Sequence, residues 1–285
     1  MQRYINCLAH HSSEGQLLIG DTHTALIDPG MMFCARETIQ NVKNALNGRP
    51  LDYILIGHTH YDHVGALPFF RTEWPDVQIA ATASGAAVLQ KDTPRTAYWE
   101  LSNYAAAMYN RHVEHYDVHL FWAGLHVKDG DTINLGNLTV QIIETPGHTR
   151  DALSFFVPEL EMIFLNETLG VLLPDNTIHP CYLTSYHDTI ASIEKCRVFN
   201  AAKLALPHRG IVGAELSHNF FEKALDANVA CRDFIADLHT RGVNDDTILD
   251  EFFARYGKDC LLQFQPKEAF VANARATIAC TIREL

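Results

Sequence analysis

Four side chains that can bind a metal ion fall within six consecutive residues, and this stretch constrains the chain more than any other feature. His58, His60, Asp62 and His63 follow an apolar run from Tyr53 to Ile56, which is typical of a buried strand. A glycine ends that strand, so the four side chains are expected on a loop at the edge of a sheet, where catalytic residues usually sit. Imidazole and carboxylate groups are favoured ligands of zinc and iron. The stretch therefore predicts a metal site in which the first two histidines turn toward one ion and the last two ligands toward a second.

The order of these residues resembles the H-x-H-x-D-H signature of the metallo-β-lactamase-fold superfamily of metallohydrolases. Three further motifs follow in the family's order: a T-P-G-H-T loop at 145–149, a strand end at 164–170 and a strand followed by a histidine at 204–210. The resemblance implies two sets of ligands, with His58, His60 and His148 for a first ion, and Asp62, His63 and His208 for a second.

Two acidic residues extend this set. Where the family has Gly-Asp and the aspartate bridges both ions, this chain has Asn166-Glu167. Glu167 offers the same carboxylate on a longer side chain, so it is expected to bridge the ions or to bind one of them; a surface residue beside a single-metal site is the alternative. The resemblance also places Asp28 behind the metal site, where it would orient the ligand loop. A turn aspartate before Pro29 is the alternative reading of Asp28.

The rest of the chain alternates expected strands and helices. A hairpin is expected at 16–30, helices at 35–46, 67–74, 84–90 and 184–199, and strands at 77–81, 125–128, 132–135, 138–144, 153–157, 162–165 and 203–206. This alternation indicates an α/β or α+β chain, and the resemblance implies a four-layer αββα metallo-β-lactamase sandwich over residues 1–213. Residues 214–285 are expected to form a helical appendage packed on the same domain, because apolar residues recur there at helical spacing. That appendage would shape the entrance to the metal site or supply a homodimer surface.

Two groups of side chains outside the motifs are candidates for the substrate pocket. Residues 94–122 are rich in aromatic side chains; most are expected to pack against their own domain, with one or two lining the pocket. His179 and His187 stand close to the helix expected at 184–199. Either could point into the cleft, but a surface location is the prediction for both.

The composition limits which binding partners and which cellular compartment are expected for this protein. The formal net charge of −12 at pH 7 argues against binding to nucleic acid or to an anionic membrane. No apolar run reaches the length of about 18 residues that a membrane-spanning helix needs, and the first residues lack the apolar core and cleavage site of a signal peptide. The seven cysteines form no CxxC pair and fit a reducing compartment. The sequence thus predicts a cytoplasmic protein with a small-molecule substrate.

The resemblance implies a dinuclear metallohydrolase. Two divalent ions, Zn, Fe or Mn, would lower the pKa of a bound water toward about 7. The resulting metal-bound hydroxide would attack a small ester, thioester or phosphodiester, while Asp62 orients it and carries a proton to the leaving group. Two alternatives stay open: a mononuclear non-haem iron persulfide dioxygenase, and a catalytically weak signalling protein of the same fold. The related flavodiiron branch has Glu in place of the second histidine of the signature, where this chain has His60.

Overall fold

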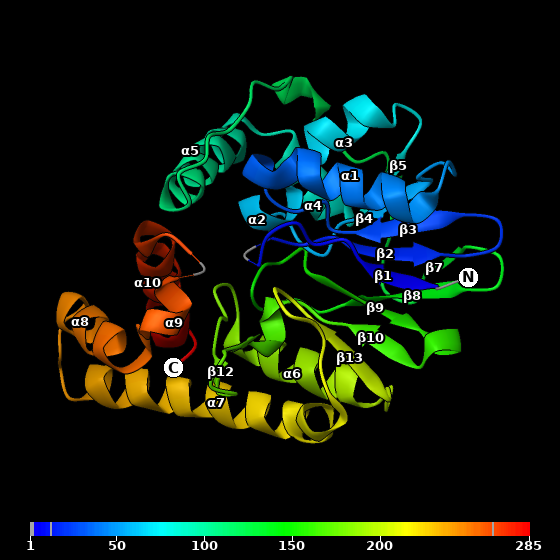
Figure 1. Ribbon diagram of the computed structural model, residues 1–285. Coiled ribbons are helices and arrows are strands. Elements are labelled where there is room, and N and C mark those ends of the chain that lie inside the picture. Colours follow the sequence, from blue (N-terminus) through cyan, green and yellow to red (C-terminus); the bar gives the residue numbers. More distant parts are fainter. Residues whose placement is uncertain (1–2, 12, 264) are drawn as a thin grey trace.

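Two six-stranded sheets form the centre of the computed structural model, which describes residues 3–11, 13–263 and 265–285 (Figure 1). The first sheet has the order β1-β2-β3-β4-β5-β6, with bounds Tyr4–Asn6, Gln16–Ile19, Thr24–Ile27, Tyr53–Leu55, Gln78–Ala81 and Leu125–His126. The second has the order β14-β13-β10-β9-β8-β7, with bounds Gly210–Ile211, Lys203–Leu206, Met162–Phe164, Leu153–Val157, Thr139–Glu144 and Thr132–Asn134. A separate pair joins β11 (Val171–Leu172) to β12 (Ile178–His179).

Successive residues of the central strands face different layers, as the two-residue period of a strand requires. Leu55 of β4 and Phe164 of β10 belong to the apolar core between the sheets. Their neighbours Ile54 and Ile163 face outward, toward the helices that cover each sheet. A strand buried on both faces reads as a continuous apolar run, which explains why the sequence around β4 shows no alternation.

Helices cover the outer face of each sheet. The first sheet packs against α1 (Ala35–Leu46), α3 (Leu67–Glu73), α4 (Ala83–Leu89) and α5 (Asp92–Met108). The second packs against α6 (Tyr186–Arg197) and the first half of α7 (Ala214–Thr240). This arrangement confirms the expected four-layer αββα sandwich.

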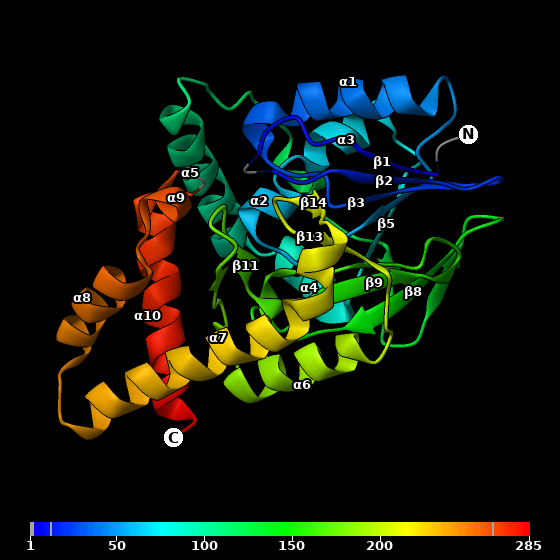
Figure 2. The same cartoon turned by 60° about the horizontal axis from the view of Figure 1, so that its bottom comes forward.

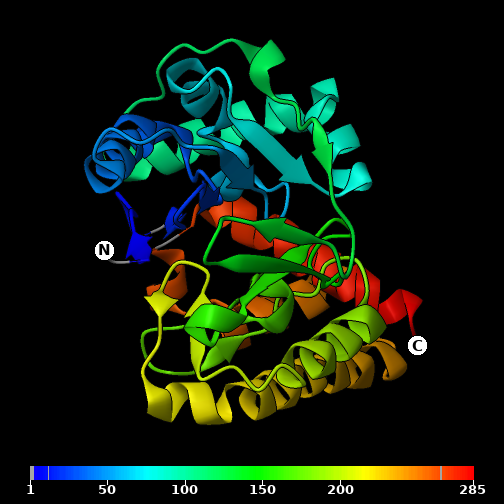
Figure 3. The ribbon, with the colours of Figure 1, turned by 90° about the vertical axis from the view of Figure 1, so that its right-hand side faces the viewer.

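The C-terminal helices build an apolar cluster of their own beside the sandwich. Ile248 of α8 (Asp245–Tyr256) and Phe270 of α10 (Lys267–Arg283) pack there with Tyr182, which precedes α6. The four-residue helix α9 (Asp259–Leu262) connects α8 to α10. Figure 2 shows α10 running from the neighbourhood of α5 to α7, so this segment stands at one end of both sheets, and Figure 3 shows it behind the sandwich. A domain boundary at residue 213 stays a prediction.

Several short elements were not expected from the sequence. They are α2 (Tyr61–Val64), α9, β1, β11, β12, β14 and the 3-10 helices Met32–Cys34, Val118–Leu120, Pro158–Leu160 and Glu167–Leu169. Two of them, α2 and the 3-10 helix at Glu167, carry candidate metal ligands. Within the described ranges, no helix combines the length and the apolar character that crossing a membrane requires. The cysteine side chains that the structure describes are buried and free of disulfides.

Candidate metal centre

The ligand loop leaves the sheet at the carboxyl end of β4, which pairs in parallel with β3 and β5. His58 and His60 lie on the loop, and the following residues wind into α2, which carries Asp62 and His63. Three hydrogen bonds fix the loop. The backbone N–H of Gly57 donates to Asp28 Oδ1 at 2.6 Å, that of Thr59 donates to Asp151 Oδ2 at 3.0 Å, and the hydroxyl of Tyr98 donates to the Thr59 carbonyl at 2.8 Å. The loop is therefore held from three separate parts of the fold.

The first cluster consists of three imidazoles. His58, His60 and His148 each offer a ring nitrogen, and these atoms lie within 4.8 Å of one another. His148 Nδ1 donates to the carbonyl of Cys181 at 2.7 Å, which turns its Nε2 toward His60 Nδ1, 2.9 Å away. Both ring nitrogens of His58 are buried without a hydrogen-bond partner among the described residues. A buried polar atom left unpaired costs about 1–3 kcal/mol, and a metal ion at this cluster would account for it.

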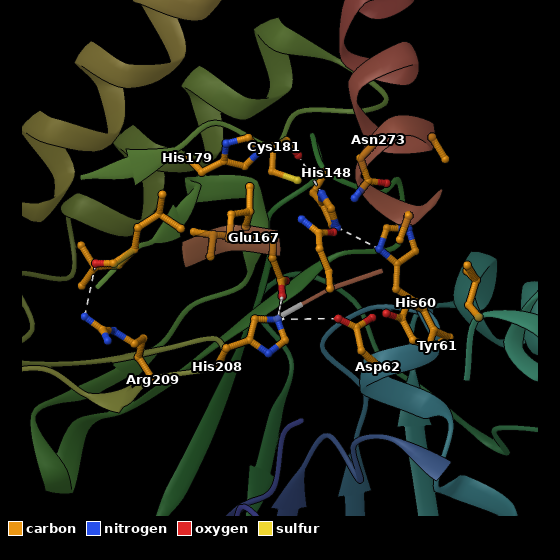
Figure 4. Close-up of a pocket in the computed structure, with 18 of the residues that line it drawn as sticks. His60, Tyr61, Asp62, His148, Glu167, His179, Cys181, His208, Arg209 and Asn273 are labelled. Carbon is orange, nitrogen blue, oxygen red and sulfur yellow. Dashed lines mark hydrogen bonds and ion pairs between the residues drawn. The ribbon is translucent and has the colours of Figure 1, made fainter. Parts of the chain in front are cut away.

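The second cluster combines two carboxylates with two imidazoles. Atoms of Asp62, His63, Glu167 and His208 lie within 4.8 Å of one another. Figure 4 shows the side chains of Asp62, Glu167 and His208 pointing toward one another. Glu167 Oε1 is 2.8 Å from His63 Nε2 and 3.1 Å from His208 Nε2, while Glu167 Oε2 is 3.5 Å from His58 Nδ1. The carboxylate of Glu167 therefore stands between the two clusters and contacts both.

Burial and charge act differently on the two clusters. In the first, burial lowers the pKa of His60 and His148 to about 4, so both imidazoles are neutral at neutral pH and offer a lone pair. In the second, burial alone would lower the pKa of His63 and His208. The neighbouring carboxylates outweigh burial and raise the pKa of His208 to about 9 and that of His63 well above its usual value. The second cluster thus attracts positive charge.

Two carboxylates stand behind the second cluster. Asp28 Oδ2 lies 2.9 Å from His63 Nδ1, in the place that the resemblance implied. Glu14 was not singled out from the sequence: it accepts a short hydrogen bond from the backbone N–H of His208, and its Oε1 lies 3.4 Å from His208 Nδ1. Burial raises the pKa of Glu14 to about 7. Because Glu14 and His208 are 194 residues apart in sequence, no local pattern could have connected them.

A cavity of about 170 Å³ opens over both clusters. His60, Asp62, His148, Glu167 and His208 form part of its wall, and the remainder comes from residues that the motifs do not include: Leu101, Val171, Leu173, His179, Leu261, Ala269, Ala272 and Asn273 are among them. The last four belong to the C-terminal helices, which therefore shape the entrance to the site.

Two expectations about pocket residues need correction. His179 is not a surface residue: it is 5% exposed, because aromatic side chains of α8 and α10 pack against its ring. It also lines the cavity. His187 is exposed as expected. Within residues 94–122, Leu101 lines the cavity and the aromatic side chains do not. The buried Tyr98 instead supports the ligand loop through its hydroxyl.

Comparison with known proteins agrees with this arrangement. Residues 16–208 match the family model of the metallo-beta-lactamase superfamily. An anaerobic nitric oxide reductase flavorubredoxin homolog of Escherichia coli O157:H7 is 30% identical over 161 residues, which cover 56% of this chain and 33% of that protein. The chain spans about a third of the length of this curated relative.

Solved structures show the same fold at low sequence identity. A metallo-beta-lactamase family protein from Thermus thermophilus has a TM-score of 0.60 at 16% identity, with 99% of this chain and 92% of that chain covered. ETHE1 from Myxococcus xanthus has a TM-score of 0.54 at 16% identity, with 79% of this chain and 85% of that chain covered. The match to the Thermus protein includes the C-terminal helices, which lie beyond the family model.

Proposed function

This chain belongs to the metallo-beta-lactamase superfamily, and on that premise we propose that it is a dinuclear metal-dependent hydrolase of a small ester, thioester or phosphodiester. The observation that carries the proposal is the position of Glu167, whose two carboxylate oxygens contact a histidine of each cluster. A group that touches both clusters at the floor of a cavity is placed to join two ions beneath a bound substrate. The identity of the ions, Zn, Fe or Mn, does not follow from histidine and carboxylate ligands.

The residues present fit two ions. His58, His60 and His148 would hold one, and Asp62, His63 and His208 the other, with Glu167 between them. When bound, such a pair acidifies water and polarises the oxygen that gains charge in the reaction. The unpartnered nitrogens of His58 and the carboxylate-rich second cluster support this assignment.

Asp62 is the group proposed to move the proton. Its carboxylate lines the cavity, and its Oδ2 lies 3.6 Å from His208 Nε2 and 3.8 Å from His63 Nε2. A carboxylate at the boundary between ligands and cavity can accept a proton from the attacking water and return it to the leaving group. The imidazoles around it are held by the carbonyl of Cys181 and by Asp28, so they keep their orientation while the substrate reacts.

A redox role is the second candidate, favoured by the match to flavorubredoxin relatives. The chain carries His60 at the position where the flavodiiron pattern has Glu, which argues against that site. A mononuclear iron dioxygenase would need only the first cluster, yet the side chains of the second cluster are also gathered within 4.8 Å. The complete second cluster therefore favours the hydrolase.

Metal content and turnover test the proposal together. Protein purified without added metal is expected to hold two ions per chain and to hydrolyse members of an ester, thioester or phosphodiester panel, with activity lost to a chelator and restored by the metal. Asp62→Asn removes a proposed ligand and should weaken the second ion; with metal in excess, so that both sites are filled, it should still lose most of the turnover, whereas His187→Asn, at an exposed position, should change neither metal content nor turnover. One iron per chain with oxygen uptake on glutathione persulfide, or no hydrolysis of any panel, would overturn the proposal.

A further inference from the structure

The cavity has an apolar compartment that the metal clusters do not explain. Val171, Leu173 and Leu261 line the cavity and belong to the apolar cluster of the C-terminal helices. Ala269 and Ala272 of α10 add small side chains to the same wall. The cavity of about 170 Å³ is close in size to an apolar cavity of about 150 Å³ that accommodates benzene. This volume includes the space over the metal clusters, so about six carbon atoms is the upper limit for a group in the apolar compartment.

Gln265 and Asn273 also line this side of the cavity, but both are half-buried, whereas the polar side chain of His179 is buried. His179 is 5% exposed and lies opposite Val171 in the β11–β12 pair, beside Cys181 in Figure 4. Its ring packs among those of Phe252 and Phe270, with centroids 6.5 and 5.8 Å away. His179 lines the cavity, and Figure 4 draws no hydrogen bond between its ring and the other residues shown there. Burial lowers the pKa of His179 to about 4, so the ring is neutral and carries one donor and one acceptor.

We propose that this compartment binds the arm of the substrate that lies away from the bond to be broken, and that this arm is an apolar group of at most about six carbons bearing one oxygen that hydrogen-bonds to His179. The identification of the bound group as part of a substrate rests on the proposed hydrolase activity, whereas the existence of the binding subsite rests on the geometry of the cavity. A site that pairs a buried imidazole with an oxygen disfavours an analogue that lacks the oxygen, because the imidazole then stays unpaired.

Phenol and benzene separate the hydrogen bond from apolar burial. Their affinities are measured by NMR titration in the wild type, in His179→Leu and in His239→Leu, a control at an exposed position of α7. The ratio of phenol to benzene affinity should fall about tenfold in His179→Leu and stay unchanged in the control, since one neutral hydrogen bond contributes about that factor. A phenol-to-benzene affinity ratio in His179→Leu that equals the wild-type ratio overturns the proposal. If His179→Leu fails to fold, His179→Gln, which keeps a hydrogen-bond donor, should retain a ratio within about threefold of the wild type.

A second variant locates the binding. Ala272 lines the cavity but is exposed, so Ala272→Trp can fill the space from the surface and should weaken both phenol and benzene at least tenfold. Unchanged affinities would place the probes elsewhere and refute the subsite.

Neither measurement requires turnover. If no ester, thioester or phosphodiester is hydrolysed while phenol binding depends on His179, the hydrolase fails and the subsite stands; if hydrolysis occurs without that dependence, the subsite fails alone.

Discussion

Glu14 offers the sharpest test of how the second cluster is held. It is 5% exposed, accepts a hydrogen bond from the backbone N–H of His208 and lies 3.4 Å from the Nδ1 atom of the same residue. His208 adopts a left-handed backbone conformation with φ of 59°, which a non-glycine residue keeps only where its surroundings enforce it. Glu14 therefore fixes both the backbone and the ring of one proposed ligand.

The magnitude follows from which contacts each substitution removes. Loss of a partner behind a metal ligand typically costs 10–100-fold in metal affinity, or about 1.4–2.7 kcal/mol. Glu14→Gln keeps an oxygen that can accept both contacts with His208 but loses the charge and the oxygen that accepts from Gln16 Nε2 at 3.5 Å, so the second ion should bind about tenfold more weakly. Glu14→Ala loses both contacts and should approach about 100-fold. Removing one partner of a buried charge pair lowers stability, because the other charge stays buried without compensation, so the unfolding free energy of metal-free Glu14→Gln should also fall.

Two-step metal titration against a competing chelator measures the two affinities separately. Asp151→Asn is the matched control: Asp151 is also buried, but it accepts from the backbone of Thr59 in the loop of the first cluster. Glu14→Gln should weaken only the second ion, and Asp151→Asn mainly the first. If Glu14→Gln weakens both ions equally, or lowers the unfolding free energy and leaves both affinities intact, the positioning argument is refuted.

Three further outcomes are expected. Glu167→Asp shortens the side chain whose oxygens now reach both clusters, so the second ion should bind about tenfold more weakly in chelator competition; equal affinities in variant and wild type would contradict the bridging position. His179 takes up a proton near pH 6.5 when unfolded but only near 4 when folded. Between pH 6.5 and 4 the unfolded state therefore binds more protons than the folded state, so the folded protein loses stability as the pH falls through this range. The unfolding free energy measured in urea should fall by about 3 kcal/mol less in His179→Leu than in the wild type between pH 6.5 and 4. Identical pH profiles of the two proteins would show that His179 does not contribute. Phe155→Ala opens a cavity between the sheets, where Phe155 is 1% exposed, and should lower the unfolding free energy by about 3–5 kcal/mol; a loss below about 1 kcal/mol would mean that the sheets collapse around the gap.

Sequence reasoning succeeded where the determining residues are close neighbours in the chain. The grouping of His58 and His60 apart from Asp62 and His63 depends on one strand end and one short turn, and the structure gathers them in that grouping. The strands and most helices were expected within a few residues, because apolar periodicity is local.

Failures arose where distant segments meet. His179 was expected on the surface because its neighbours in sequence give no sign of burial, yet Phe252 and Phe270, more than 70 residues later, cover its ring. Glu14 stands in a polar stretch before β2 and reads as an ordinary exposed glutamate until the fold brings His208 against it. In both cases the deciding information is the packing of one segment on another, which no single window of sequence contains.

The position of the C-terminal helices has a consequence for synthesis on the ribosome. The last proposed ligand in the sequence is His208. Leu261 and Ala269, which complete the cavity wall, are synthesised about 60 residues later. At about 5–20 residues per second, translation of that interval takes roughly 3–12 s. During those seconds the ligand loops can be gathered while the side that α9 and α10 later cover is open to water. Ions can therefore enter the nascent chain by a route that is narrower in the finished protein.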